Sequence, residues 1–389
     1  MTTALAEPTD STVDDSLEMR RMLCESAADF VLRADLAKAV REWRGKEPGF
    51  DRARWREMAD LGWTGIRIPE ESGGSGLSVA DAAALLTETG RGLGPEPLTA
   101  VAILAARCIV EGGEPAACAA LLPGIADGSK IVVAAIADKA GQVSASEISA
   151  TTTPDGDGAR LSGTKLYISG AAGAGGFIVA ARAPQGVGLY HVARNATGVT
   201  LDVRPYTDGT FCGTLRLDNV SVGAADIVAK PGRGEAALDA ALEEARVCAS
   251  AEMLGLMRQA HAMTLDYLRT RKQFGKAIGS FQALQHRAVD LFVEIELTRS
   301  AIDRAVRTLD SSNDPRERAL AASACKARAS DSALHVAREA IQMHGAIGYT
   351  DEHDIGLFVR RALVLSAWLG NAGAHRRRYE TLAPAPDVA

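Results

Sequence analysis

A short stretch after a long apolar helical pattern, residues 271–286 (RKQFGKAIGSFQALQH), combines residue types that a surface helix does not need. Arg271, Phe274 and Gln282 offer a guanidinium, an aromatic ring and an amide. Because the chain has a formal net charge of −6, any anionic ligand has to be met by local arginines. We therefore predict that this stretch binds a ligand. The alternative is that Arg271 is a solvated charge at a helix end and Phe274 a core residue.

A second stretch, residues 342–350 (QMHGAIGYT), carries Gln342, Gly345 and Gly348. Glycine has no Cβ, so backbone N–H groups at these positions can approach a phosphate or a ribose. The same glycines also fit a helix end, with Gly345 as the C-cap and Gly348 turning the loop. Both interpretations can hold together, and we predict these three residues to be binding residues.

Composition and charge exclude several classes of function. The chain of 389 residues is 47% hydrophobic and 24% charged, as in a globular protein, and its acidic balance disfavours nucleic acid as a partner. Six scattered cysteines and seven dispersed histidines give neither a disulfide framework nor metal-ligand spacing. The N-terminus has no signal-peptide pattern, and no apolar run reaches the ~18 residues of a membrane span. We expect a reduced, cytoplasmic protein without a metal.

The elements that must position these residues fall into three segments. Residues 1–128 show apolar residues at helical spacing, and residues 129–230 consist of short Val-, Ile- and Tyr-rich runs separated by turn residues. Residues 231–389 are helical again and are typical of a bundle. We therefore predict an α+β multidomain fold with an N-terminal helical domain, a small middle β domain and a C-terminal four-helix bundle. The four long helices are expected at 234–271, 280–309, 314–345 and 352–382.

This order of domains, together with RKQFGKAIGSFQ, QMHGAIGYT and, less closely, LYISG, resembles the acyl-CoA dehydrogenase family over nearly the whole chain. The resemblance implies FAD as the cofactor and residues 271–282 as a contact to the FAD of a neighbouring subunit. Arg271 matches the arginine at the pyrophosphate, where a planar guanidinium suits two phosphate oxygens. Phe274 matches an aromatic beside the cofactor, and Gln282 the glutamine on the adenosine side. Ala346 replaces the second glycine of the later motif.

The stretch LYISG stands where the family has a Trp-Ile-Thr triplet. The resemblance gives Tyr167 the role of the ring that packs on the flavin and Ser169 that of the hydroxyl at flavin N5. The alternative is an ordinary half-buried strand. A family motif before this strand, Thr-Glu-Pro-Gly-x-Gly-Ser-Asp, is replaced by IADKAGQVSASE, in which Lys139, Ser144 and Ser146 are possible substitutes.

The family reaction removes an α-proton and a β-hydride from an acyl thioester, and a glutamate takes the proton. Relatives place this glutamate at one of two positions, which Gly370 and Ala245 occupy here. Within the chain Glu244, beside Ala245, is the predicted catalytic base, with Glu252 as the second choice. The alternatives are that Glu244 belongs to an acidic helix face, that Glu252 is a buried partner of a nearby basic residue, or that the base resides on an unlike subunit.

Three functions therefore stay open. The first is an FAD-dependent acyl-CoA dehydrogenase subunit, which acts on an acyl-CoA thioester and passes electrons to an electron-transfer flavoprotein or a similar acceptor. The second is a catalytically silent partner that shares an FAD site, because the chain's ending resembles the actinobacterial and pimeloyl-type subunits of mixed assemblies. The third is a diverged flavoenzyme, such as an oxidase or an enzyme for another acyl carrier. A homo- or hetero-oligomer, dimer or tetramer, is expected, and the run His375–Arg378 is a possible phosphate contact.

Overall fold

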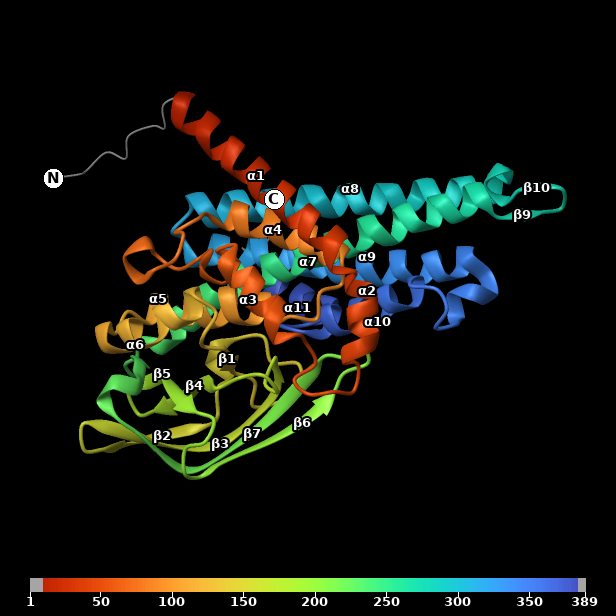
Figure 1. Cartoon of the computed structure of the whole chain (residues 1–389). Helices are drawn as coiled ribbons and strands as arrows, with labels where there is room; N and C mark the ends of the chain where they lie inside the picture. Colours follow the sequence, from red (N-terminus) through yellow and green to blue (C-terminus); the bar gives the residue numbers. More distant parts are fainter. Residues whose placement is uncertain (1–9, 384–389) are drawn as a thin grey trace.

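The computed structural model describes residues 10–383, in which a layer of helices lies against one mixed β-sheet (Figure 1). N-terminal helices and the long C-terminal helices intermingle on one side of the molecule, and the sheet lies on the other. The predicted order of a helical segment, a small sheet and a helical bundle is confirmed.

The N-terminal part is helical because its apolar residues recur at helical spacing and its helix ends carry caps. At the start of α4, the Ser78 hydroxyl accepts the Asp81 N–H and the Asp81 carboxylate accepts the Ser78 N–H. The helices are α1 (Asp10–Ala34), α2 (Leu36–Trp43), α3 (Arg52–Asp60), α4 (Val79–Arg91), α5 (Ala106–Gly112) and α6 (Pro115–Ala126), with a π-helical segment at Thr99–Ala105 leading into α5.

The sheet has the strand order β6-β7-β3-β2-β4-β5-β8, and β1 pairs with β4. Its centre is apolar on both faces, as the buried run from Gly176 to Ala181 in β4 shows. The strands are β1 (Val132–Ala135), β2 (Thr151–Asp155), β3 (Gly158–Ser169), β4 (Gly176–Ala183), β5 (Gly186–Ala193), β6 (Val199–Pro205), β7 (Phe211–Val222) and β8 (Ile227–Ala229).

The C-terminal part contains α7 (Gly234–Thr270), α8 (Gln282–Ser311), α9 (Pro315–His344), α10 (Ile355–Ala367) and α11 (Ala372–Leu382). The predicted fourth long helix is therefore two helices, broken at residues 368–371. The reason is backbone conformation: Leu369 and Gly370 have φ of 59° and 102°, which no α-helix accommodates. This break is part of the site described below.

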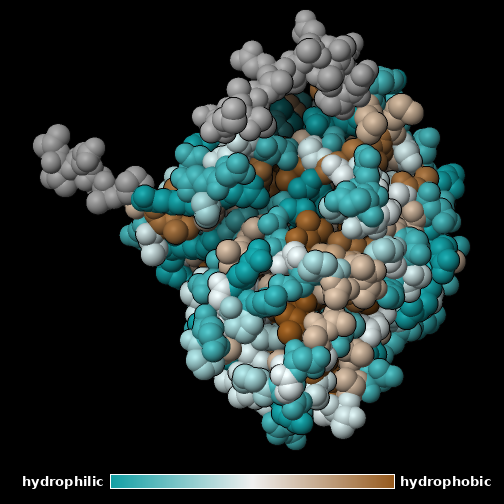
Figure 2. Space-filling model, turned by 90° about the vertical axis from the view of Figure 1, so that its left-hand side faces the viewer, coloured by the Kyte–Doolittle hydropathy of each residue, from teal (hydrophilic) through white to brown (hydrophobic). Residues whose placement is uncertain are grey.

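Helix α7 is the central element, because N-terminal helix α4, bundle helix α9 and the sheet all pack around it. Gly90 and Gly255 allow α4 and α7 to approach closely, since a Cβ at either glycine would overlap the backbone of the facing helix. The outer surface on one side is largely hydrophilic, with small apolar patches near its middle (Figure 2). Within residues 10–383, no helix is long and apolar enough to cross a membrane.

Candidate functional site

A cavity of about 540 Å³ lies between the sheet, α7 and the break between α10 and α11. We call it the central cavity. Its wall is mostly apolar and includes Leu104, Ala134, Leu242, Trp368 and Gly370. A cavity of this size and lining suits a flat or aliphatic ligand group.

Tyr167 is the predicted flavin residue that lines the central cavity. Its side chain is 51% exposed and its φ is 56°, at an irregularity in the pairing of β3 with β7. An aromatic residue with a left-handed backbone costs free energy, and such strain concentrates at functional sites. Ser169 lies two residues on and lines a smaller adjoining pocket, the side pocket, which shares Val364 and Trp368 with the central cavity.

The loop that replaces the family's acidic motif is pinned to β3 by Lys165. This buried ammonium lies 2.8 Å from the Asp138 carboxylate and donates to the Ile136 carbonyl at 3.0 Å. Burial lowers the pKa of Lys165 to about 8, although Asp138 opposes this shift. Farther along the loop, Lys139 pairs with Glu147 at 2.9 Å.

The hydroxyls of Ser144 and Ser146 lie 2.9 Å apart and bond to each other. Two of the three possible substitutes in this loop are therefore engaged with one another, and the third, Lys139, is held by a carboxylate of the same loop.

Gly370, at the position implied for the family's base, is fixed as glycine by its surroundings. Its φ is 102°, and a Cβ would lie 2.5 Å from Val143 Cγ1 and 2.7 Å from His375 Nε2. Hydrogen bonds from Arg246 and His375 hold the loop around Gly370 in place. Arg246 donates to the carbonyls of Val143 and Leu369, and the His375 Nε2–H donates to Leu369 at 2.9 Å. A carboxylate side chain therefore does not fit at this position.

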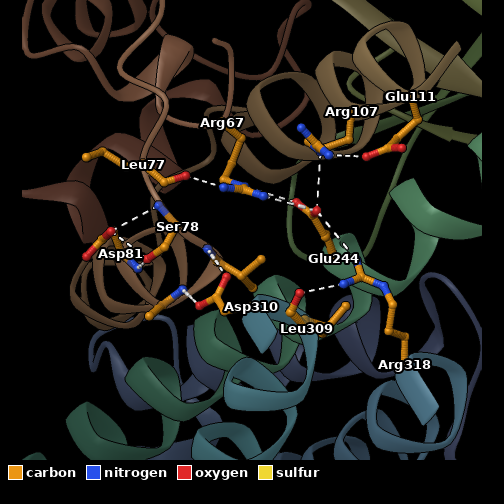
Figure 3. A network of polar contacts seen from close by, with 12 residues as sticks. Arg67, Leu77, Ser78, Asp81, Arg107, Glu111, Glu244, Leu309, Asp310 and Arg318 are labelled. Atoms are coloured by element: carbon orange, nitrogen blue, oxygen red, sulfur yellow. Dashed lines mark hydrogen bonds and ion pairs between the residues drawn. The ribbon is translucent and has the colours of Figure 1, made fainter. Parts of the chain in front are cut away.

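Glu244, the predicted base, faces away from the central cavity. Leu242 and Arg246 line that cavity, and a residue two positions from each lies about 200° around the helix. The Glu244 side chain is 3% exposed and accepts from Arg67 at 3.0 and 3.1 Å (Figure 3). Arg107 and Arg318 approach it to 3.3 and 3.8 Å. Glu244 is therefore the centre of a group of ion pairs, and we do not propose it as the catalytic base.

Glu252 lies on the same face of α7 as Ala245, as its spacing predicts, but it lines the side pocket rather than the central cavity. Both of its oxygens are occupied, one by Arg361 at 2.5 and 3.0 Å and the other by the Thr99 hydroxyl at 3.2 Å. Arg361 also donates to Asp208 at 2.9 Å, so this network ties α7 and α10 to the sheet domain.

Among residues 10–383, no aspartate or glutamate lines the central cavity. A third, larger and more open groove lies beside it and shares Gly141, Val143 and Ser144 with its wall. That groove contains Glu243, Glu244 and several arginines, including Arg67, Arg107, Arg318, Arg377 and Arg378. Glu243 and Glu244 thus lie near the central cavity but outside it.

The possible phosphate contact at residues 375–378 is largely engaged in internal contacts. Arg376 pairs with Asp331, and Arg378 pairs with Glu243 and donates to Ser323 at 2.8 Å. His375 is fully buried, and burial together with nearby cations lowers its pKa to about 2, so it is neutral. The run mainly fastens α11 to the bundle.

Arg271, Phe274 and Gln282 lie far from the sheet, on an arm formed by the end of α7, the start of α8 and the β9–β10 hairpin (Lys272–Gln273, Lys276–Ala277; Figure 1). All three are exposed, and none lines the central cavity. Phe274 is 89% exposed and forms the tip of the hairpin with Gly275. Their φ values of 53° and 78° are those a type I′ turn requires, where Asn or Gly is usual and Phe is strained.

The later motif folds as its glycines predict. Gly345 ends α9 with a φ of 65°, and Gly348 is buried against the helix end. Gln342 is exposed on the last turn of α9. The chain therefore holds two separate groups of predicted cofactor residues. Tyr167 and Ser169 surround its own cavities, whereas the arm residues point into solvent.

Two domain models of one family match the chain. "Acyl-CoA dehydrogenase, N-terminal domain" matches residues 18–129, and "Acyl-CoA dehydrogenase, C-terminal domain" matches residues 232–380. Acyl-CoA dehydrogenase IpdE2 of Mycobacterium tuberculosis is 30% identical over 347 residues, 89% of this chain and 91% of that protein. The chain belongs to the acyl-CoA dehydrogenase family.

Two solved structures resemble this chain in sequence and in fold. The Tcur3481-Tcur3483 steroid ACAD is 32% identical with a TM-score of 0.85, and covers 94% of this chain and 98% of its own. The ChsE4-ChsE5 complex from Mycobacterium tuberculosis is 25% identical with a TM-score of 0.85, and covers 97% and 99%. FAD is the cofactor of this family. The apolar central cavity beside an exposed, strained tyrosine fits a flat ring system, and the arm offers a guanidinium and an aromatic for the rest of such a cofactor.

The sequence allowed Glu252 as a buried partner of a basic residue, but sequence reasoning missed its partner Arg361, the further contact to Asp208 and the buried Lys326. The signal for Lys326 was present, because it lies four residues after Ala322 and four before Ser330, in the small-residue stripe that α9 buries. No comparable signal marks Asp208, which reaches the site through the tertiary fold.

Proposed function

We propose that this chain is the subunit of a mixed acyl-CoA dehydrogenase that helps to build a shared FAD site and leaves the catalytic base to an unlike partner. The observation that carries the proposal is that no carboxylate of residues 10–383 lines the central cavity, at whose wall Gly370 excludes one sterically. Removal of an α-proton from an acyl thioester needs a nearby base, which typically contributes ~10²–10⁴-fold to the rate. A homomer of this chain lacks that contribution.

The arm is this chain's contribution to the partner. Arg271, Phe274 and Gln282 are exposed on an ordered projection and do not line the chain's own central cavity. Arg271 would hold the cofactor phosphates, where its fixed charge and paired donors suit two oxygens. Phe274 would pack beside the cofactor, and the cost of its backbone conformation is then offset by that contact. Gln342 and Gly345 would approach the cofactor from the end of α9.

Apart from what it contributes to the partner, the chain forms its own apolar central cavity. Tyr167 would pack on the flavin ring and the Ser169 hydroxyl would bond its edge. Lys165, Arg246 and His375 hold the two loops that form the wall, and the apolar lining excludes water from the thioester. When bound, FAD supplies the hydride acceptor, and an electron-transfer flavoprotein or a similar acceptor would take the electrons onward.

The comparisons support a mixed assembly without identifying the partner. The ChsE4-ChsE5 complex and the Tcur3481-Tcur3483 steroid ACAD each carry the names of two components. The second name also mentions a steroid, and a steroid-derived acyl group is therefore one substrate class to include in an assay. A diverged flavoenzyme, such as an oxidase or an enzyme for another acyl carrier, is the remaining alternative, and the retained cofactor residues Arg271, Phe274 and Gln282 are what favours it.

The test is co-expression with a second acyl-CoA dehydrogenase homologue from the same source, one that carries the family's glutamate. We expect a stable mixed oligomer that contains FAD and reduces an electron acceptor with an acyl-CoA, whereas the isolated chain turns over at least ~10²-fold more slowly. Turnover of the isolated chain at the rate of the mixed oligomer would contradict the proposal. FAD-dependent oxidation without any partner would favour the oxidase alternative.

A further inference from the structure

Glu96 carries a buried carboxylate oxygen that has no hydrogen-bond partner within residues 10–383. Its side chain is fully buried, and its Oε1 accepts from Arg54 Nε at 3.0 Å. The second oxygen, Oε2, is the one without a partner. A buried acceptor without a donor costs free energy, and most buried polar groups avoid this cost. An open oxygen of this kind therefore indicates a place where a polar group of a ligand fits.

This oxygen lies at the side pocket, which has a volume of about 40 Å³. Glu96 and Gly94 both line the pocket, and a Cβ on Gly94 would lie 3.3 Å from Glu96 Oε2. The open side of Gly94 therefore faces Oε2. The side pocket meets the central cavity at Val364 and Trp368, which belong to the walls of both. It has room for a hydroxyl group and the carbon that carries it, at the end of a ligand that fills the central cavity.

The other polar groups of the side pocket are engaged or assigned. Both oxygens of Glu252 are occupied, as described above, and the Thr89 hydroxyl donates to the Leu86 carbonyl at 3.4 Å. The Ser169 hydroxyl is the one that we assign to the flavin. Among the described carboxylates that line the pocket, Glu96 Oε2 is thus the oxygen left open for an acyl group.

Charge and protonation select a hydroxyl group as the ligand group. The buried ionisable groups in and behind the side pocket are three carboxylates and two guanidiniums, namely Glu96, Glu252, Asp208, Arg54 and Arg361. Their negative balance disfavours a carboxylate on the ligand. Burial raises the pKa of Glu96, and Arg54 and nearby backbone N–H groups oppose this. A hydroxyl both donates and accepts, so it pairs with Oε2 whether or not Glu96 carries a proton, whereas a keto group or an ammonium fits one protonation state only.

We propose that the side pocket is a subsite for a hydroxyl group on the acyl chain of the ligand, and that Glu96 is the residue that selects it. The hydroxyl bonds Oε2, while Arg54 holds the other oxygen and so fixes the direction of the carboxylate. The inference rests on the proposed function for the acyl-CoA ligand. The preference for a hydroxyl rests on the pocket alone, so the two can fail separately.

The experiment compares octanoyl-CoA with its isomers that carry one hydroxyl, at each carbon from C4 to C8, by calorimetric titration of the full chain. We expect at least one isomer to bind at least ~10-fold more tightly than octanoyl-CoA, as a hydrogen bond to a charged group allows. Gly94→Ala should remove this preference, because its methyl group would cover Oε2 without reaching Arg54. Gly94 has no positive φ, so alanine fits its backbone.

Gly223→Ala is the matched control, because a Cβ there would lie 3.8 Å from another carboxylate oxygen, Asp226 Oδ2, but outside both cavities. It should keep the wild-type preference. Glu96→Gln is the second variant, and it should reduce the preference about three- to tenfold, because it replaces a charged acceptor by a neutral amide. A wild-type chain that binds no isomer more tightly than octanoyl-CoA would overturn the proposal. So would a preference that survives unchanged in Gly94→Ala or in Glu96→Gln.

A second arm uses S-ethyl thioesters of the same acyl groups, which lack the CoA part, and follows tryptophan emission, since Trp368 lines both cavities. If octanoyl-CoA binds without a hydroxyl preference, this inference fails and the proposed function stands. If no CoA thioester binds, the proposed substrate class fails, and the S-ethyl thioesters decide the role of the pocket. A hydroxyl preference that Gly94→Ala removes would then support the subsite, and equal or absent binding would overturn it.

Discussion

Replacing Gly370 by alanine should destabilise the chain by about 2–5 kcal/mol. A left-handed backbone costs a residue with a side chain about 1–2 kcal/mol. The added Cβ would also lie 2.5 Å from Val143 and 2.7 Å from His375, and such overpacking typically costs about 1–3 kcal/mol. Val143 is itself held by Arg246, so it has little room to yield.

Gly345→Ala is the matched control, because Gly345 also has a positive φ, 65°, but nothing lies within 4 Å of its Cβ position. It should cost only the backbone term, about 1–3 kcal/mol, because φ 65° with ψ −141° is a conformation nearly restricted to glycine. Both variants are compared by urea unfolding followed by circular dichroism. A loss for Gly370→Ala that is no larger than that for Gly345→Ala would refute the view that this wall excludes a side chain, and with it the steric reason for the missing base.

Three further predictions follow from the contacts. Arg271→Ala should weaken FAD binding in the mixed oligomer about 10–150-fold, because it loses a charged contact of ~1.5–3 kcal/mol. Flavin release measures this loss, and Arg269→Ala at the same end of α7 should leave FAD binding unchanged. Glu244→Gln should lower the unfolding free energy by about 3–5 kcal/mol, because it leaves largely buried arginines without their carboxylate. The half-exposed Glu296→Gln should change it by less than ~1 kcal/mol, and equal losses would contradict this. Because the pKa of Lys165 is lowered to about 8, the unfolded chain binds more protons than the folded one between about pH 8 and 10.5. Stability should therefore rise with pH there, and a Lys165→Met variant with the same slope would refute this.

The sequence predicted the arrangement of the fold well because its periodicity changes twice, from helical spacing to short β-rich runs and back. It did not predict the break between α10 and α11, since Leu369 adopts a positive φ that leucine normally avoids. Only the tertiary contacts of Arg246 and His375 with that loop make this conformation stable.

The candidate site was predicted in part. Residue types and motif spacing predicted Arg271, Phe274 and Tyr167 as binding residues. All three are exposed, Phe274 and Tyr167 have a strained backbone, and their role in binding stays a prediction. The sequence did not predict which way the Glu244 side chain points, because the apolar pattern of one helix does not tell which residues of α7 face a cavity formed by other elements. Once Leu242 and Arg246 are known to face it, helical phase places Glu244 on the other side.

The central claim is that the proton acceptor is not in this chain, and turnover of the mixed oligomer after carboxylate-to-amide exchange tests it most directly. Acceptor-linked oxidation of an acyl-CoA is measured with Glu244→Gln or Glu252→Gln in this chain, and with the glutamate of the family motif changed to glutamine in the partner. We predict a loss of at least ~10²-fold for the partner variant and less than ~10-fold for either variant of this chain that still assembles with bound FAD. A full loss in Glu252→Gln with an active partner variant would contradict the account and make Glu252 the base.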